Sequence, residues 1–242
     1  MGRALWIFMA FATGGMAASA ESPAPMVGAD AAAAMREAKK LADEAVRLAL
    51  DTFRKDARQA KDEAGRADAV RALGSTECKD ARILSALAPS LTTDGDLVRV
   101  ASAEAIGSFR GQRRAAQALV AAIQPNKKSA AVLEAIFRAL GAVGDASASQ
   151  ALADFLGDRR GKVAAAAARA LGDVGGTAAA DALRRALDRI EHAGGIPGAN
   201  GPGRGGDNAA MEAAKRDAGE RSDVVAPALR DALARVGTPA GG

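Results

Sequence analysis

Residues that carry most enzyme chemistry are scarce in this chain of 242 residues. It contains one cysteine, one histidine and no tyrosine, and aromatic residues make up 3% of the sequence. A single cysteine cannot form an internal disulfide, and one cysteine with one histidine cannot supply the paired ligands of a zinc site. A nucleophile and its own base are equally hard to assemble from this set. We therefore expect no catalytic residues, no metal and no cofactor, and we predict that the protein is not an enzyme.

The few candidate reactive residues each have a structural interpretation. His192 stands beside Ala193-Gly194-Gly195, where we expect it to face the last carbonyl groups of a helix. Cys78 is expected to be a small buried apolar residue, with a reactive thiol as the alternative. We interpret Thr93-Asp94-Gly95-Asp96 as a capping turn, because no glutamate closes the twelve-residue pattern of a calcium loop.

The first twenty residues have the pattern of a secretory signal peptide. Met1-Gly2-Arg3 gives a short positive start, Ala4 to Ala12 form an apolar run, and Ala18-Ser19-Ala20 offer small residues for cleavage. This apolar run is too short to span a bilayer comfortably, and no later run is long enough. We predict cleavage before Glu21 and an exported protein, periplasmic or secreted. A retained N-terminal anchor is the alternative.

The composition of the rest of the chain favours helices over sheet. Hydrophobic residues make up 49% of the sequence and are mostly alanine, whereas charged residues make up 26%. A sheet would require more β-branched and aromatic residues, and the charge content is accompanied by enough apolar residues to form a core. We therefore predict an all-α fold.

A short motif recurs at a nearly constant interval. It stands at Arg71-Ala72-Leu73-Gly74, Glu104-Ala105-Ile106-Gly107, Arg138-Ala139-Leu140-Gly141 and Arg169-Ala170-Leu171-Gly172, so that its glycines are 33, 34 and 31 residues apart. In the last three copies an aliphatic residue precedes the glycine by nine and an alanine by six, on one helix face. We expect each glycine to end its helix, because glycine tolerates a positive φ. Leu140 and Leu171 should then be buried between neighbouring helices.

A second amphipathic segment follows each of these helices after a short turn. Its apolar positions are Leu119 and Ile123, Leu152 and Leu156, and Leu183 and Leu187. Pro125 ends one such segment. Polar residues suited to cap the next helix stand between the repeats, at Asp96, Ser129 and Asp158. The unit is therefore a pair of antiparallel helices.

The segment Val98-Arg99-Val100-Ala101-Ser102-Ala103-Glu104-Ala105-Ile106-Gly107 resembles the first-helix signature of HEAT-like repeats, of the type also found in phycobilisome lyases. Val132 to Gly141 and Val163 to Gly172 are weaker copies that lack the arginine at the second position. The resemblance covers about residues 66–191. It implies an α-solenoid of about four to five HEAT-like helical hairpins. An ordinary helical bundle is the alternative, but a bundle would not need a fixed period.

The segment before the repeats fits the capped end of such an array. Residues 21–65 are predicted to hold a loose start and N-terminal capping helices. The apolar side of these helices would carry Met35, Leu41, Leu48 and Phe53, and opposite charges four residues apart would cover the other side. A coiled coil is the alternative, but the apolar spacing is too irregular for one.

The segment after the repeats is less regular. We place the repeats at residues 66–192 and a Gly/Pro-rich linker at 193–206. Residues 207–242 are predicted to be a degenerate repeat or cap, because Ala228 to Leu233 echo Ala182 to Leu187.

Basic residues concentrate in the middle repeats. Residues 97–172 hold eleven basic and five acidic side chains. Most of the basic residues stand in predicted turns, at Arg110, Arg113, Arg114, Lys127, Lys128, Arg159, Arg160 and Lys162. Since the turns of a solenoid stack, these side chains are predicted to line one or both edges and to attract an anionic partner. The alternative is that turns are simply where charges are best solvated.

These features predict a non-catalytic exported scaffold that binds a protein or peptide, or an anionic envelope component. The resemblance implies that the second helices line the concave side, where the outward positions are Gln117, Gln150, Asp154, Arg184 and Arg185. One alternative is a lyase-like protein that holds a tetrapyrrole or similar cofactor, which the single cysteine and histidine disfavour. Another is a binder of an anionic polymer or nucleic acid, and base stacking is disfavoured by the lack of aromatic residues.

Overall fold

The computed structural model describes residues 28–193 and 223–236, and every regular element within these two ranges is a helix. The predicted all-α fold is therefore confirmed. The predictions for the signal peptide at 1–20, for the loose start before residue 28, for the linker after residue 193 and for the chain end after 236 lie outside the described ranges. Two compact units divide the chain, Met1–Leu41 and Ala42–Gly242.

Helix α1 (Gly28–Gln59) is one continuous helix rather than two shorter ones. Every residue from 33 to 45 is exposed, and the exposed fractions of Met35, Leu41 and Leu48 are 75%, 62% and 68%. The predicted apolar side is thus wrong for these three residues. The buried side chain of the helix is Val46, with Leu50 and Phe53 half-buried beside the core. These three follow the spacing i, i+4 and i+7, which places them on a different helix face from Leu41 and Leu48.

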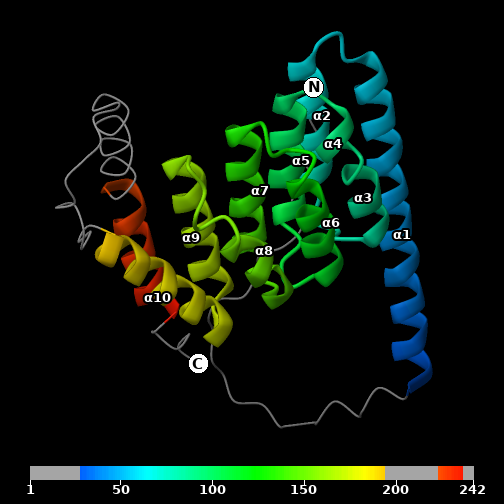
Figure 1. Ribbon diagram of the computed structural model, residues 1–242. Helices are drawn as coiled ribbons and strands as arrows, with labels where there is room; N and C mark the ends of the chain where they lie inside the picture. Colours follow the sequence, from blue (N-terminus) through cyan, green and yellow to red (C-terminus); the bar gives the residue numbers. More distant parts are fainter. Residues whose placement is uncertain (1–27, 194–222, 237–242) are drawn as a thin grey trace, which may run out of the picture. The chain divides into compact units, whose positions relative to one another are not determined.

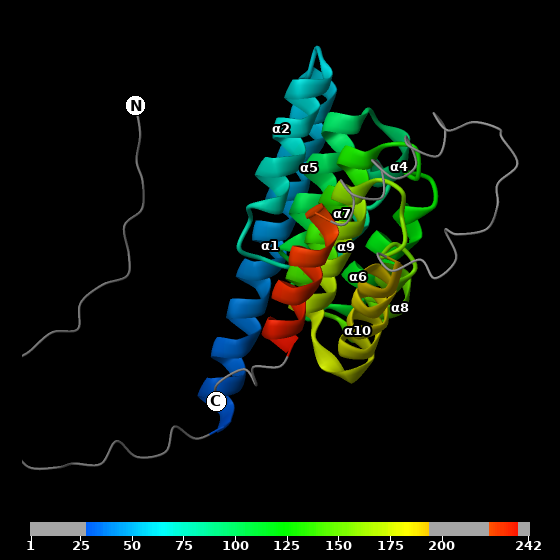
Figure 2. The same ribbon diagram turned by 60° about the vertical axis from the view of Figure 1, so that its left-hand side comes forward.

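From Ala42 onward the helices form two layers (Figures 1 and 2). The layer of first helices consists of α2 (Glu63–Gly74), α5 (Asp96–Gly107), α7 (Ala130–Val143), α9 (Gly161–Val174) and a helix over residues 223–236. The layer of second helices consists of α3 (Ala81–Leu87) with α4 (Ser90–Thr93), α6 (Arg113–Ile123), η1 (Ala146–Ala148) with α8 (Ser149–Ala153), and α10 (Gly176–Ala193). The predicted pairs of antiparallel helices are confirmed.

One continuous hydrophobic core runs between the layers. Leu140 in α7 and Leu171 in α9 are both 0% exposed, as predicted. The second helices contribute Leu119, Leu152 and Leu183, which are also fully buried. Because α7 packs between α5 and α9, it shares its apolar residues with two neighbouring first helices.

Gly74 and Gly107 are the last residues of α2 and α5, as predicted, but none of the four motif glycines has the expected positive φ. Gly141 and Gly172 lie inside α7 and α9, which continue to Val143 and Val174. The glycine with the left-handed backbone that ends α7 is Gly144, at φ +71. The motif glycines are needed for another reason, namely the close approach of the next first helix.

Each motif glycine faces an alanine of the following copy. A Cβ atom on Gly74 would lie 2.3 Å from the Cβ of Ala105, and one on Gly107 would lie 3.1 Å from the Cβ of Ala139. In each motif after the first, the alanine therefore contacts the glycine of the previous copy. The glycine of the same motif contacts the next first helix. Since real Cβ atoms do not approach to less than about 3 Å, any side chain at Gly74 would push α2 and α5 apart.

The 223–236 helix takes the place of the next first helix after α9. A Cβ on Gly172 would lie 2.9 Å from the Cβ of Ala232, which matches the contacts of the earlier motif glycines. Arg235 pairs with Asp173 at 2.6 Å, and Arg230 pairs with Glu191 of α10 at 2.9 Å. The helix therefore aligns with the first helices and not with α10, whose sequence it echoes.

Candidate partner-binding surfaces

The turns between repeats are joined to one another by hydrogen bonds. Glu63 of α2 accepts from the backbone N–H of Leu97 at 2.8 Å, next to Gly95, the N-cap of α5. Ser129, the N-cap of α7, donates from its Oγ to Asp96 at 2.7 Å. Of the predicted caps, Ser129 is thus confirmed, whereas Asp96 is the first residue of α5 and accepts from the next turn.

Arg160 extends this series to the turn before α9. Its Nη1 donates to the carbonyl oxygen of Lys127 at 2.9 Å, while its Nε and Nη2 donate to the carboxylate of Asp158 at 3.0 and 2.9 Å. The side-chain hydrogen bonds to Asp158 raise the pKa of the Arg160 guanidinium. Arg160 therefore holds two consecutive turns together, a structural role that differs from the predicted attraction of an anion.

The bond from Arg160 brings four other basic residues onto neighbouring turns. We call this set the turn cluster, and it consists of Lys127, Lys128, Arg159 and Lys162. All four side chains are exposed. No ion pair to any of them is found among residues 28–193 and 223–236. The predicted basic edge is therefore assembled here as a compact set of exposed cations.

The other predicted basic residues lie at the opposite end of α6. Arg110 follows α5, and Arg113 and Arg114 form the first turn of α6, whereas Lys127 follows the end of that helix. The 11 residues of α6 separate the two groups by roughly 16 Å at 1.5 Å per residue. Arg110, Arg113 and Arg114 are exposed, and Arg113 adds a smaller electrostatic effect to the hydrogen bonds from Ser147 that lower the pKa of Asp145. The basic residues thus form two groups, one at each end of α6.

The predicted outward positions of the second helices are all exposed. Gln150 of α8 and Asp154, the C-cap of that helix, are joined by a hydrogen bond of 3.0 Å. Arg184 pairs with Asp181 of its own helix at 3.1 Å. No hydrogen bond or ion pair in the described ranges joins the side chain of Gln117 in α6 or of Arg185 in α10 to these residues. The layer therefore offers a mixed polar surface and no assembled site.

The candidate reactive residues His192 and Cys78 contact a helix carbonyl group and the hydrophobic core, respectively. The Nδ1 atom of His192 lies 2.7 Å from the carbonyl oxygen of Asp188, so the predicted contact with a helix carbonyl is confirmed. Cys78 is a half-buried free cysteine in the loop between α2 and α3, packed against the core. Among the described residues no group of three or more His, Cys, Asp and Glu side chains is placed to hold a metal ion.

Asn126 is a buried polar residue that the sequence pattern does not single out. Asn126 is 1% exposed, and its Nδ2 donates to the carbonyl oxygens of Leu91 and Ala122 at 2.9 and 2.8 Å. Its Oδ1 accepts from Arg99 at 3.2 Å. Asn126 thereby ties α6 to α4 and α5 directly beneath the turn that carries Lys127. Its position beside Pro125 suggests a loop residue, and only the fold shows that it is enclosed.

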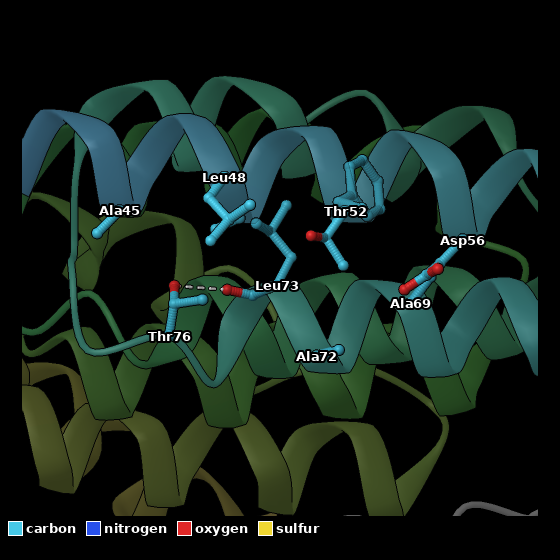
Figure 3. Close-up of a pocket in the computed structure, with 10 residues that line it drawn as sticks. Ala45, Leu48, Thr52, Asp56, Ala69, Ala72, Leu73 and Thr76 are labelled. Carbon is cyan, nitrogen blue, oxygen red and sulfur yellow. Dashed lines mark hydrogen bonds between the residues drawn. The ribbon is translucent and has the colours of Figure 1, made fainter. Parts of the chain in front are cut away.

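An apolar groove between α1 and α2 was also missed. It has a volume of about 290 Å³. It is lined by Ala45, Leu48, Thr52 and Asp56 of α1, by Ala69, Ala72 and Leu73 of α2, and by Thr76, which follows α2 (Figure 3). Ala49 and Phe53 complete the lining. The sequence of α1 does not predict this groove, because the groove depends on how far α2 lies from α1.

Comparison with known proteins agrees with this architecture. A family model of HEAT repeats matches residues 125–192, the part of the chain that contains α7, α8, α9 and nearly all of α10. The helical pairs within residues 125–192 therefore match HEAT repeats, which commonly mediate protein interactions. The match is to HEAT repeats in general, so the phycobilisome-lyase type stays a prediction. No curated protein matches the chain.

None of the described helices is both long enough and apolar enough to cross a membrane.

Proposed function

We propose that this protein is an exported, non-catalytic scaffold that binds an acidic protein or peptide at the turn cluster. The observation that carries the proposal is the set of four exposed cations, Lys127, Lys128, Arg159 and Lys162, on two turns that Arg160 joins. Many other arginines of the structure have a carboxylate partner, such as Arg82 with Asp43 at 2.6 Å. Exposed cations without such partners attract anions from solution.

The supports of the turn cluster are rigid. Asn126 anchors one turn to α4, α5 and α6, and Asp158 holds Arg160 beneath the other. Because the backbone of both turns is fixed, an acidic segment would meet the four charges in a constant arrangement, and less ordering entropy would oppose binding. The export part of the proposal rests on the sequence of residues 1–20 alone.

The charge proposal is tested with a fluorescent acidic peptide of about twenty residues as the probe. Reversal of Lys127→Glu together with Lys128→Glu should weaken binding about tenfold, since each exposed charge contact contributes modestly. Arg113→Glu with Arg114→Glu is the matched control, because it changes the net charge equally at the other end of α6. Arg160 is left unchanged, since it supports the turns.

Fluorescence anisotropy across salt concentrations gives the decisive comparison. Binding should weaken between 0.1 M and 1 M salt, where the Debye length falls from about 10 Å to about 3 Å. Equal losses in the two double variants would show that only the net charge matters, which contradicts a specific cluster. Recognition on the second helices, at Gln117, Gln150, Asp154, Arg184 and Arg185, would then be tested next. For export, the intact mass of protein recovered outside the cytoplasm should correspond to a chain that begins at Glu21.

A further inference from the structure

We propose that the acidic partner of the turn cluster is an extended protein segment with four contact residues at every third position. In order along the segment, these residues are apolar, acidic, acidic and apolar. The inference rests on the proposed function and specifies the partner of that same site. It follows from a row of exposed residues that crosses four first helices and extends beyond the turn cluster on both sides.

The alanines that contact a neighbouring motif glycine give four of the first helices a common register. They are Ala105 in α5, Ala139 in α7, Ala170 in α9 and Ala232 in the 223–236 helix. The residue eight positions before each alanine therefore lies at the same height and on the same face of its helix. We call these four residues the register row, and they are Leu97, Ala131, Lys162 and Val224.

The register row has an exposed apolar residue at each end. Leu97 and Val224 are 53% and 43% exposed, and the other large apolar residues that are exposed in the described ranges all belong to α1. Ala131 and Lys162, between them, are exposed as well. Single exposed apolar residues are common on protein surfaces, but these two share one register and flank the cations. One partner can therefore contact both of them.

Lys128 and Arg159 place further cations on the two middle helices of the row. Each stands eleven positions before the motif alanine of its helix. Lys128 is thus three residues before Ala131, and Arg159 is three residues before Lys162. The start of α7 and the start of α9 therefore present cations in equivalent places, one helix spacing apart.

Exposed carboxylates limit the acidic part of the partner to these two middle helices. Asp96 precedes Leu97, and Asp223 precedes Val224, and both carboxylates are exposed. An acidic residue of the partner would meet a like charge at either end of the row. An apolar residue would instead bury surface against Leu97 or Val224. The row therefore favours apolar residues at the ends of the segment and acidic residues in its middle.

The carboxylates near the middle helices leave the cations exposed. Asp158 is bonded to Arg160 at 2.9 Å, and Asp154 accepts from Gln150 at 3.0 Å. Glu134 is half-buried one turn further into α7. In the described ranges neither Asp154 nor Glu134 forms an ion pair with the turn cluster. The middle of the row thus retains positive charge for a partner.

The spacing of the helices sets the spacing of the partner. Packed helices lie about 8–10 Å apart, and glycine against alanine allows the close approach seen here. A polyproline II segment has three residues per turn and rises about 3.1 Å per residue, so every third side chain faces the same side at intervals of about 9 Å. A β-strand repeats a face at about 6.6 Å and fits less well. Like charges also extend a chain, so an acidic segment favours this conformation over a helix.

Two peptides of ten residues and identical composition test the spacing. Each contains two leucines, two glutamates, three prolines and three serines, with leucine at its first and last positions. The matched peptide has glutamate at its fourth and seventh positions, and the mismatched peptide has it at its third and eighth. The matched peptide should bind about fivefold more tightly, because only its glutamates face the cations. NMR titration of the isotope-labelled full-length protein measures both dissociation constants, even for weak binding.

Two double variants test the apolar ends of the row. Leu97→Ser with Val224→Ser should weaken binding of the matched peptide about fivefold, because the peptide leucines lose their contacts. The same variant should not change the affinity of a peptide with serine in place of both leucines. Leu41→Ser with Leu48→Ser is the matched control, since these leucines are 62% and 68% exposed on α1, and it should leave binding unchanged. Both variants should keep the circular dichroism spectrum of the unaltered protein.

The outcomes separate this inference from the proposed function. Equal affinity for the two ten-residue peptides, absence of binding by either, or equal losses in the two double variants would overturn the inference. The proposed function would still stand if the long acidic peptide bound and the reversals of Lys127 and Lys128 weakened it. The cluster would then attract acidic segments without selecting their spacing. If the long peptide also failed to depend on the cluster, both proposals would be wrong.

Discussion

The first helices from α2 to α9 pack against one another in a different way from how α1 packs against α2. Between α2 and α9 each helix approaches the next through glycine against alanine, so that a Cβ at Gly74 would meet Ala105 at 2.3 Å. Between α1 and α2 no such pair exists, and α1 contributes Val46 and Phe53 to the core instead. The groove beside Leu48 remains between these two helices. Small residues thus allow close packing inside the array, and their absence at α1 leaves Leu48 exposed.

This difference extends to the charges. In the middle repeats the turns are held by internal hydrogen bonds, and the basic residues above them are exposed. On α1 the packed face is narrow, and leucine side chains remain in solvent. The turns that carry the exposed cations are therefore held by hydrogen bonds, whereas α1, which carries the exposed leucines, is incompletely packed. The following four predictions test this contrast, from the largest expected effect to the smallest.

Leu171→Ala should destabilise the protein by about 2–5 kcal/mol. Leu171 is 0% exposed in α9, so its removal loses transfer free energy and leaves a cavity in the core. Urea unfolding followed by circular dichroism gives the free energy of unfolding. A change within error would contradict the packing of α9 described above.

Gly74→Ala should cost about 1–3 kcal/mol, because the new methyl group would overlap Ala105 and force α2 away from α5. Gly157→Ala is the matched control, since no atom lies within 4 Å of a Cβ there. The control should change the free energy of unfolding by less than about 0.5 kcal/mol. Equal effects from both substitutions in the same unfolding experiment would exclude close approach as the reason for the motif glycine.

Asp80→Ala should cost about 1 kcal/mol at neutral pH, because Asp80 is the N-cap of α3 and accepts from the backbone N–H of Arg82 at 2.7 Å. Hydrogen bonds from the Arg82 side chain and backbone lower the pKa of Asp80. The stabilisation is therefore present above the unfolded pKa of about 4 and is lost as pH falls through the lower folded value. Unfolding measurements from pH 7 to pH 3 should show the two proteins converging, and a constant difference would contradict a role for the ionised carboxylate.

Leu48→Ala should change the free energy of unfolding by less than about 0.5 kcal/mol, since the side chain is already 68% exposed. The contrast with Leu171→Ala is the useful quantity, because both substitutions remove the same atoms. A loss of 2 kcal/mol or more at Leu48, measured in the same urea titrations, would mean that α1 packs as tightly as the repeats.

Much of the fold could be predicted because the residues that recur in each repeat have one common structural role, namely burial on a helix face. Leu140 and Leu171 recur with a fixed period, and a buried aliphatic residue on a helix face is the common reason for such a period. The role of the glycines could not be predicted in the same way. Glycine serves both a positive φ and a close approach, and only the distance from Gly74 to Ala105 distinguishes these uses.

The candidate sites depended more on tertiary contacts. Exposed lysines and arginines could be placed in turns, but the sequence did not show that Arg160 would bond to Lys127 and become structural. It also left open whether Arg113 and Lys127 line one edge or two, and the structure places them at opposite ends of α6. The groove beside Leu48 depends on the separation of two helices, which has no direct signature in either helix.

Hydrogen–deuterium exchange on the full-length protein tests the contrast between the two regions most directly. Backbone amides in α7 and α9 should exchange only through global unfolding, because these helices are packed against neighbours on two sides. Amides of residues 33–45 in α1, all of them exposed, should exchange through local opening at rates at least about a hundredfold higher. Protection of residues 33–45 equal to that of α7 would contradict the account.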